Sequence, residues 1–163
     1  MQIISDKFGV VKIDDNSIID FPGGIPGFTN LTKFAIVKCL QTDPVQWFQS
    51  VEDGHITLPV INPFLIKPDY NIEINDDDLD LIKTHNEEDL IVLNVMVLPE
   101  DLKNMTINLM APILVNIKDM IGCQILMDHK EVPLRYPAYQ ALMEYYMKNA
   151  EGVADSAGSD KKD

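Results

Sequence analysis

Residues 21–28 decide the fold, and they read Phe21-Pro22-Gly23-Gly24-Ile25-Pro26-Gly27-Phe28. Glycine reaches positive φ without strain, and proline fixes φ and lacks an N–H donor, so neither a helix nor a central strand can continue through this stretch. We therefore predict a covered corner between two strands, with Phe21 and Phe28 packed against a core. A phosphate-binding loop would need a Lys and a Ser or Thr at a fixed offset, and residues 29–33 do not supply that spacing.

Short apolar runs rich in β-branched residues surround this corner, and turn residues such as Ser, Asp, Asn and Gly separate them. About ten short strands with few helices favour a mainly β fold, an antiparallel barrel or sandwich, over a parallel sheet that alternates with helices. The predicted strands are residues 3–4, 8–13, 17–21, 33–40, 47–51, 56–61, 70–74, 90–98, 105–109, 112–117 and 120–127.

Two of these strands carry more specific information about their places in the sheet. Residues 90–98 are almost continuously apolar, which is typical of a central strand buried on both faces. Residues 47–51 and 56–61 flank a Glu-Asp-Gly turn and predict a hairpin. Pro59 cannot donate to a ladder, so it should lie at an edge or a bulge.

Two segments predict helices instead of strands. Carboxylates crowd the start of the segment 75–83, where the helix dipole favours them, so we predict a short acidic helix there. The second helix, residues 136–149, has an apolar stripe at helical spacing that should pack back on the barrel, with a partner-binding face as the alternative. The stripe consists of Tyr136, Tyr139, Leu142, Met143, Tyr146 and Met147.

The predicted organisation is therefore a β domain over residues 1–135, a C-terminal helix over 136–149 and a disordered acidic tail over 150–163. The start of the chain has neither the cationic segment nor the apolar run of a signal peptide, and no run approaches the length of a membrane span. We therefore predict a cytoplasmic protein. Cys39 and Cys123 both lie inside apolar runs and should be buried, reduced thiols.

The charge of the chain restricts the class of partner. There are 13 Lys and Arg residues against 26 Asp and Glu residues, which gives −13 in total, and residues 150–163 contribute −2 of this, so the folded part carries about −11. Such a surface repels phosphate, because nucleic-acid affinity comes mainly from Lys and Arg that displace counterions. It suits a basic protein partner and favours a monomer before that partner arrives.

The sequence contains no recognised signature of catalysis or cofactor binding. The three histidines, His55, His85 and His129, are far apart and fall in no metal-ligand pattern. The aspartates that begin at Asp76 do not fit a calcium loop, because Leu81 stands where that loop needs glycine. Without a nucleophile elbow or a nucleotide fingerprint, we predict a binding module, not an enzyme, with no cofactor.

Several motifs, taken in order, resemble the family of flagellar assembly factor FliW. The resemblance covers roughly residues 1–135, and the order of the motifs is more specific than any one of them. The chain continues beyond it with an extension from Pro137 to Asp163, whose role cannot be carried over. The motifs are Phe21 with Gly24-Ile25-Pro26-Gly27-Phe28, then Gln49-Ser50-Val51, then Asn62-Pro63-Phe64 with Tyr70, and finally the stretch from Asn108 to Asn116 followed by Gln124.

This resemblance implies a small β-barrel-like protein that binds two partners in turn. One partner is flagellin, and the other is the RNA-binding translational regulator CsrA. Accumulating flagellin would take the FliW-like protein and leave CsrA free to repress flagellin translation, whereas secretion of flagellin would release the protein to inhibit CsrA. No catalytic step is implied.

The residues suggest where each partner would bind. Carboxylates docked beside the basic surface of CsrA would repel incoming phosphates, and the candidates are Asp76, Asp77, Asp78 and Asp80. An apolar groove would capture an amphipathic segment of flagellin. Its candidate lining is Phe64, Leu65 and Tyr70 together with the turn that holds Asn108, Leu109 and Pro112.

The sequence leaves two alternatives open. Each apolar candidate can be a core residue instead of a contact residue, because large apolar side chains are mostly buried. The rival function is a single-stranded nucleic-acid-binding β-barrel, which the acidic charge opposes.

Overall fold

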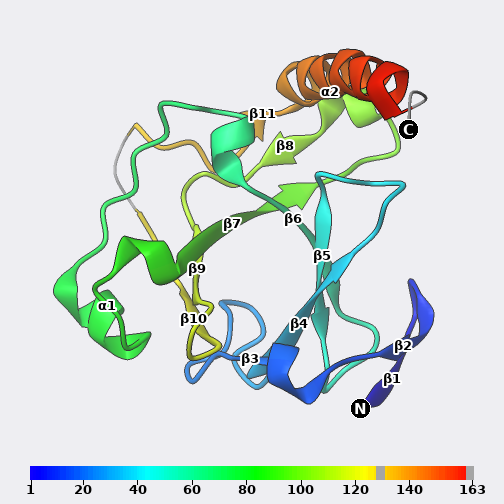
Figure 1. Ribbon diagram of the computed structural model, residues 1–163. Helices are drawn as coiled ribbons and strands as arrows, with labels where there is room; N and C mark the ends of the chain where they lie inside the picture. The colour runs from blue at the N-terminus through cyan, green and yellow to red at the C-terminus, as the bar shows by residue number, and fades with distance from the viewer. Residues whose placement is uncertain (128–130, 161–163) are drawn as a thin grey trace.

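The computed structural model describes residues 1–127 and 131–160, with side chains described as far as residue 150 (Figure 1). Its main feature is a closed barrel. The barrel is closed by an additional pairing between β7 (Leu90–Val97) and β9 (Ile113–Asn116), each of which also pairs with other strands. The mainly β, barrel-like fold predicted from the sequence is confirmed. In the described part of the chain, seven strands form the closed ring: β3 (Ile19–Asp20), β4 (Lys33–Lys38), β5 (Gln46–Ser50), β6 (Thr57–Ile61), β7 (Leu90–Val97), β9 (Ile113–Asn116) and β10 (Ile121–Gln124).

Strand pairing follows the predicted antiparallel pattern with one difference. Neighbouring strands in the ring are antiparallel, but β10 pairs with β3 in parallel, with Ile121 opposite Asp20. β7 pairs with β6, β8 and β9, as expected of a central strand. Pro59 lies where β6 pairs with β5 alone, because the ladder to β7 involves only Val60 and Ile61. The predicted edge position of Pro59 is therefore confirmed.

The glycine-rich corner connects β3 to β4. Gly24 and Gly27 have φ values of +68° and +90°, which L side chains rarely adopt. A Cβ atom on Gly24 would also lie 2.6 Å from the carbonyl oxygen of Thr29. Phe21 is fully buried and Phe28 packs against the same core, so the predicted anchoring of this corner is confirmed.

The barrel interior is built around three phenylalanines. The rings of Phe34 and Phe48 stack at 4.9 Å between centroids, and Phe21 meets both edge-on at 5.6 and 5.4 Å. All three are completely buried, because alternate residues of each strand point inward. Aliphatic side chains fill the remaining space: Ile19, Val60, Leu93, Ile113 and Val115.

A second apolar core lies on the outside of the barrel. Trp47, Met96 and Leu114 point outward from their strands and are covered by other parts of the chain. The covering elements are the 3-10 turn η2 (Pro63–Leu65), strands β8 (Thr106–Ile107) and β11 (Tyr136–Pro137), and helix α2 (Tyr139–Asp160). Ile82 and Met105 also join this core, directly after helix α1 (Asp76–Leu81) and the turn η4 (Leu102–Asn104), whereas the turn η3 (Glu87–Asp89) contributes no residue to it.

The predicted strand over residues 70–74 is wrong. This segment is irregular and lies against the outer core, where Tyr70 is buried and Ile72 and Ile74 are partly buried. Its alternating pattern therefore reflects burial of every second side chain without a strand partner.

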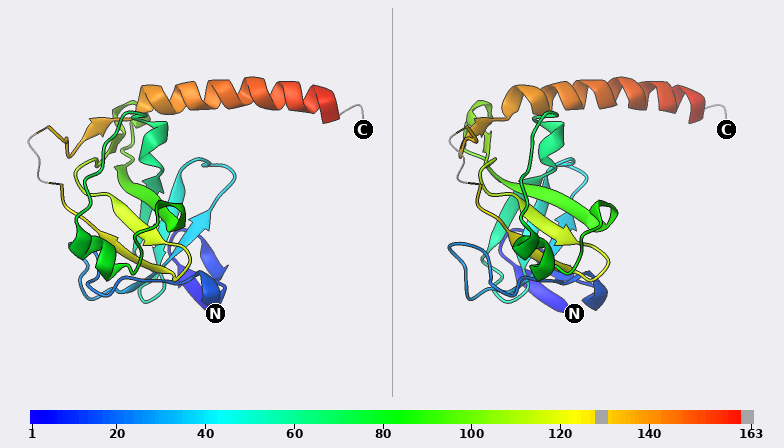
Figure 2. Two further views of the ribbon diagram at one scale, coloured as in Figure 1. Left: turned by 60° about the vertical axis from the view of Figure 1, so that its left-hand side comes forward. Right: turned by 90° about the vertical axis from the view of Figure 1, so that its left-hand side faces the viewer.

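Both predicted helices form. The acidic helix α1 begins after Asn75, whose side chain accepts a hydrogen bond of 2.8 Å from the backbone N–H of Asp78. α2 begins at Tyr139 and not at residue 136 as predicted, because Tyr136 and Pro137 pair with β8 as strand β11. It extends to Asp160, beyond the boundary predicted at residue 149, and its first turns lie across one end of the barrel (Figure 2). The tail predicted over 150–163 thus falls partly on this helix, and residues 161–163 lie outside the described residues.

The two cysteines are free thiols, as predicted. Cys123 is buried, and this burial raises the pKa of its thiol to about 11. Cys39 is only partly buried, because it lies at the end of β4 and not within the barrel wall.

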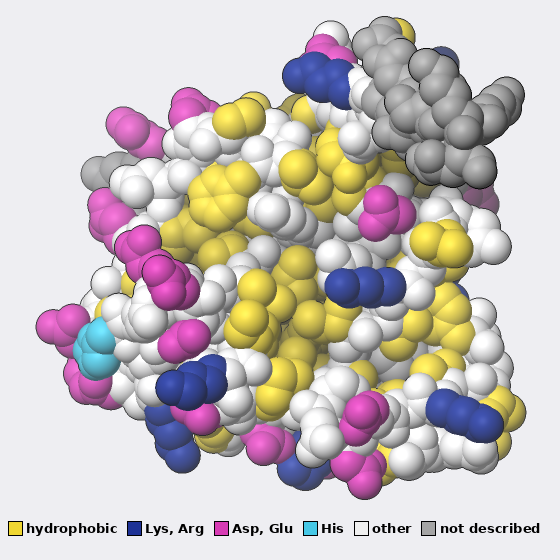
Figure 3. Space-filling view, viewed as in Figure 1, with side chains coloured by type: hydrophobic (Ala, Val, Ile, Leu, Met, Phe, Trp, Pro, Cys, Tyr) yellow, Lys and Arg dark blue, Asp and Glu magenta, His cyan; other side chains and the backbone are white. Residues whose placement is uncertain are grey.

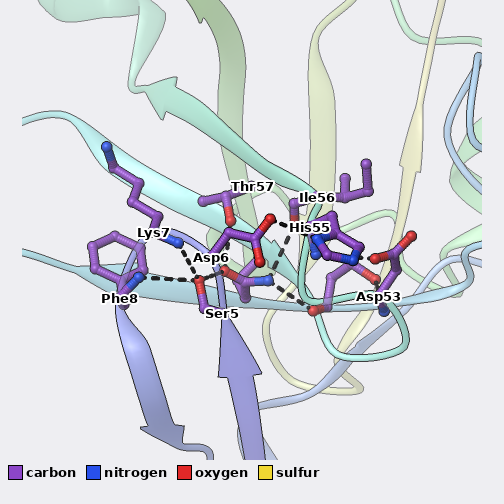
Figure 4. A network of polar contacts seen from close by, with 10 residues as sticks. Ser5, Asp6, Lys7, Phe8, Asp53, His55, Ile56 and Thr57 are labelled. Atoms are coloured by element: carbon purple, nitrogen blue, oxygen red, sulfur yellow. Dashed lines mark hydrogen bonds and ion pairs between the residues drawn. The ribbon is translucent and has the colours of Figure 1, made fainter.

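The N-terminal hairpin, β1 (Gln2–Ser5) and β2 (Gly9–Lys12), forms a separate sheet that is fastened to the barrel by polar contacts (Figure 4). The buried side chain of Gln49 accepts hydrogen bonds from the hydroxyls of Ser5 at 2.7 Å and Thr57 at 2.6 Å. The backbone N–H of Asp6 donates to the carbonyl of Gly54 at 3.0 Å. Gln49, part of the sequence motif quoted above, thus joins the hairpin to the barrel.

An exposed ion pair at this junction should make it sensitive to pH. His55 Nδ1 lies 2.5 Å from a carboxylate oxygen of Asp6, and the hydrogen bond and charge of Asp6 raise the pKa of His55 above its ordinary value. The stabilisation is therefore fully present below the pKa of unfolded His55 and is lost as the pH rises through the folded value. We expect NMR titration to give a raised pKa for His55 that Asp6→Asn lowers toward its ordinary value, with the smaller effect of the Asp53 charge remaining. An unchanged pKa in Asp6→Asn would exclude this pairing in solution.

Candidate functional site

An apolar groove opens at the mouth of the barrel. It has a volume of about 490 Å³, and Figure 3 shows hydrophobic side chains gathered in the hollow at the centre of this face. We call it the mouth groove. It is lined by Ile36, Lys38, Gln46, Asn62, Phe64, Leu90, Ile91, Val92 and Leu93.

The mouth groove exists because β6 ends early. Asn62 and Pro63 end the strand, since Pro63 has no N–H for a ladder and Asn62 caps η2 by accepting a hydrogen bond of 3.0 Å from the N–H of Phe64. β7 therefore pairs with β6 only from Asn94 onward. Its first residues, 90–93, pair with β9 alone among the described strands, so an apolar strand edge stays uncovered beside β6.

Phe64 is the predicted site residue that the structure places in the mouth groove. Its side chain is 40% exposed, although it is large and aromatic. Its ring centroid lies 5.9 Å from that of the buried Tyr70, so the two rings pack against each other. Leu65, the next residue, points the other way and packs against the outer core.

Tyr70 and the turn from Asn108 to Pro112 are brought together, but as a structural network. The buried hydroxyl of Tyr70 donates to the carbonyl of Leu109 and accepts from the amide of Asn94 at 3.2 Å, and burial raises the pKa of Tyr70. Asn94 also donates to the carbonyl of Asn108 at 2.8 Å. The side chains of Tyr70, Leu109 and Pro112 are buried, so they do not lie on the surface of the free protein.

Carboxylates lie to one side of the mouth groove on the same face, although Asp78 lines a separate hollow with Asn75 and Leu126. Asp76, Asp77 and Asp80 are exposed on α1, and Asp78 is partly exposed. The turn η3 adds exposed Glu87 and Glu88 directly before β7, whose first residue lines the groove. Figure 3 shows Asp and Glu side chains gathered along the left side of the hollow. We call these six residues the carboxylate rim.

Sequence reasoning missed most of the groove lining. Ile36, Ile91 and Val92 lie in strands whose apolar character predicts burial, and nothing within those strands says that β6 stops short of them. The Asn-Pro pair at positions 62–63 was the available signal, because Pro lacks the ladder donor and Asn favours a cap or turn.

The fold and the groove can now be compared with known proteins. The sequence profile of the family described as FliW protein matches residues 2–138. The chain belongs to the FliW family. Flagellar assembly factor FliW of Caldicellulosiruptor saccharolyticus is 42% identical over 138 residues, which cover 85% of this chain and 90% of that protein. Flagellar assembly factor FliW of Clostridium kluyveri is 38% identical over 140 residues, which cover 86% and 97%.

The architecture of the FliW domain agrees with this assignment. A solved structure titled crystal structure of the flagellar assembly factor FliW superposes with a TM-score of 0.80 at 26% identity, and the match covers 85% of this chain and 97% of that one. The FliW match ends at residue 138, directly before α2.

Within residues 1–127 and 131–160, no helix is both long and apolar enough to cross a membrane. Over the same residues, no three His, Cys, Asp or Glu side chains gather in a way that could hold a metal ion.

Proposed function

We propose that this protein is a cytoplasmic flagellar assembly factor that binds flagellin and antagonises CsrA, and so couples flagellin synthesis to secretion. The mouth groove with its carboxylate rim is the observation that carries the proposal. The names of the relatives, flagellar assembly factor FliW, support the process in which it acts.

The mouth groove suits an amphipathic protein segment. Phe64 and the uncovered start of β7 supply an apolar floor, and exposed apolar surface of this kind marks protein interaction sites. A segment that is unfolded in the free partner can fold its apolar face into such a groove. The family resemblance implies flagellin as this partner, and the terminal regions of flagellin are largely unfolded in the monomer.

The carboxylate rim suits the second partner. An RNA-binding regulator such as CsrA presents a basic surface, and the folded part of this chain carries about −11. Docking of the rim beside that surface would place negative charge where RNA phosphates approach, which weakens RNA binding without filling the RNA site. The two partners would then bind in turn as the amount of unsecreted flagellin changes.

A single groove substitution tests this proposal. Phe64→Ala should weaken flagellin binding about thirtyfold, the loss typical of a buried aromatic anchor, and leave the fold intact because Phe64 is partly exposed. Isothermal titration calorimetry with flagellin monomer measures the effect. Leu40→Ala is the matched control, since Leu40 is 94% exposed and lies outside the groove, and it should bind like the wild type. Equal binding by both variants would remove Phe64 from the interface.

Titration of the wild type with flagellin and with CsrA, separately and in competition, tests the exchange of partners. Displacement of one by the other is the expected result. Binding of neither would refute the proposed function, and tight RNA binding at physiological salt would favour the nucleic-acid-binding alternative.

A further inference from the structure

Helix α2 lies on an apolar surface that belongs to the FliW domain. Leu142 is buried against this surface, and Met143 and Tyr146 pack beside it. The backbone contacts run to η4 and η2, and the N–H of Ala138 donates to the carbonyl of Met105 at 3.1 Å just before the helix begins. We call this surface the α2 seat. It consists of Thr42, Val45, Trp47, Leu98, Leu102 and Met105.

The α2 seat lies within the part of the chain that matches the FliW family, whereas α2 lies outside it. Every residue of the α2 seat lies within the matched range 2–138, whereas α2 begins at Tyr139. The match to the solved FliW chain covers 97% of that chain but 85% of this one, so part of this chain extends beyond the match. α2 is therefore an addition to a domain that the seat helps to form.

The contact between α2 and its seat is short and incomplete. A cleft of about 200 Å³ remains open between Leu142, Met143 and Tyr146 on the helix and the barrel beneath them. The hydroxyl of Tyr146 reaches the carbonyl of Thr42 only at 3.5 Å. Met147 is already 66% exposed, so the described contacts end after about two turns. A helix held by so few contacts can be replaced by a similar one.

We propose that the α2 seat is a docking surface for an amphipathic helix of a partner protein, which displaces α2 when it binds. The incoming helix carries a stripe of Leu, Met and aromatic side chains, as α2 does. Lys or Arg residues flank that stripe, because the carboxylates of Asp43 and Asp101 border the seat beside Tyr146 and η4. This proposal does not depend on flagellin or CsrA being the natural partner.

The α2 seat is continuous with the mouth groove through η2. Phe64 lines the groove on one side of this turn, whereas Leu65 packs into the outer core that α2 covers on the other. A partner helix that takes the place of α2 would therefore contact the same turn that shapes the groove. Release of α2 and occupation of the groove are thus expected to influence each other.

The chain contains its own reporter for the seat. Trp47 is the only tryptophan, it lines the cleft under α2, and its side chain is 6% exposed. Lys7 covers the ring at 4.0 Å and Phe8 meets it edge-on at 6.0 Å, so the hairpin keeps the rest of the indole covered. Departure of α2 therefore shifts the Trp47 emission to longer wavelength and increases its quenching by acrylamide.

Substitutions at Glu144 change the stability of α2 in either direction, and the exposed side chain of Glu144 does not pack against the barrel. Glu144→Pro breaks the helix, and Glu144→Ala at the same position strengthens it. The probe is a fluorescein-labelled synthetic peptide with the sequence of residues 138–150, which contains no tryptophan. We expect the peptide to bind full-length Glu144→Pro about a hundredfold more tightly than Glu144→Ala, because proline and alanine differ by that factor in a helix interior.

Binding is measured by fluorescence anisotropy, and Trp47 emission is recorded in the same titration. The emission should shift to longer wavelength in Glu144→Pro and return as the peptide binds, whereas a peptide with Ser at the positions of Leu142 and Met143 should do neither. If Glu144→Pro does not fold, Glu144→Gly gives the same comparison at about fivefold. The proposal is overturned if Trp47 emission is the same in all variants, if it shifts and no peptide binds, or if light scattering shows that α2 of a second copy fills the seat.

Discussion

Phe34→Ala should destabilise the protein by about 3–5 kcal/mol, the range measured for removal of a buried aromatic side chain. Phe34 is completely buried and contacts the rings of both Phe21 and Phe48, so its removal leaves a cavity in the middle of the barrel. Domains of this size have a free energy of unfolding of about 5–15 kcal/mol in total. Urea unfolding followed by the emission of Trp47 measures the loss.

The matched control for this experiment is Phe64→Ala, which removes the same atoms from a partly exposed position. It should cost less than half as much, because the groove side of Phe64 already faces solvent. Conversely, an equal cost at both positions would mean that Phe64 is a core residue, and the mouth groove would lose its central contact.

Reversal of four charges on α1 should abolish inhibition of CsrA. The variant Asp76→Lys, Asp77→Lys, Asp78→Lys, Asp80→Lys changes the rim from repelling phosphate to attracting it. Association with a basic partner should slow at least tenfold at low salt, because electrostatic steering changes association rates by ten to a thousandfold. Stopped-flow association and an RNA-binding assay with CsrA measure the two effects.

Net charge must be separated from the position of the charges. A control with the same total change carries Lys at Asp15, Asp69, Asp119 and Glu131, which are exposed and lie outside both the carboxylate rim and the α2 seat. This control variant should still inhibit CsrA, and it should lose only the part of the association rate that comes from the long-range field of the net charge. Inhibition that survives reversal on α1 would refute the electrostatic account. Circular dichroism of both variants is needed as well, since carboxylates also stabilise the first turn of α1 through the helix dipole.

Local chemistry made much of the fold predictable. The corner at 21–28, the edge position of Pro59 and the central place of residues 90–97 follow from glycine, proline and apolar patterning alone. The parallel pair of Asp20 and Ile121 could not be predicted, because nothing within either strand specifies a partner that lies so far away in the sequence. The prediction of a strand over residues 70–74 was wrong, because alternation of apolar residues indicates which side chains are buried and not whether the backbone pairs with another strand.

The candidate site was less predictable than the fold. Phe64, Leu65 and Tyr70 belong to one short apolar and aromatic stretch, yet one lies in the groove and the others pack into the outer core. Residue type predicts that a side chain seeks an apolar environment, but not whether that environment is the protein itself or a partner. The groove depends on which strand stops first, which is a property of the assembled sheet.

Barrel closure also sets the order in which the chain can fold. The ring is completed when β9 pairs with β7 and β10 pairs with β3. The first strand of the ring, β3, therefore gains its second neighbour only after a strand near the end of the domain has been synthesised. Contacts between distant parts of a sequence make folding slow, because the entropy of closing the loop is lost before the contact forms. The nascent chain therefore cannot close the barrel that carries the mouth groove until residues 121–124 have been synthesised, and a partly translated chain should not compete with the finished protein for its proposed partners.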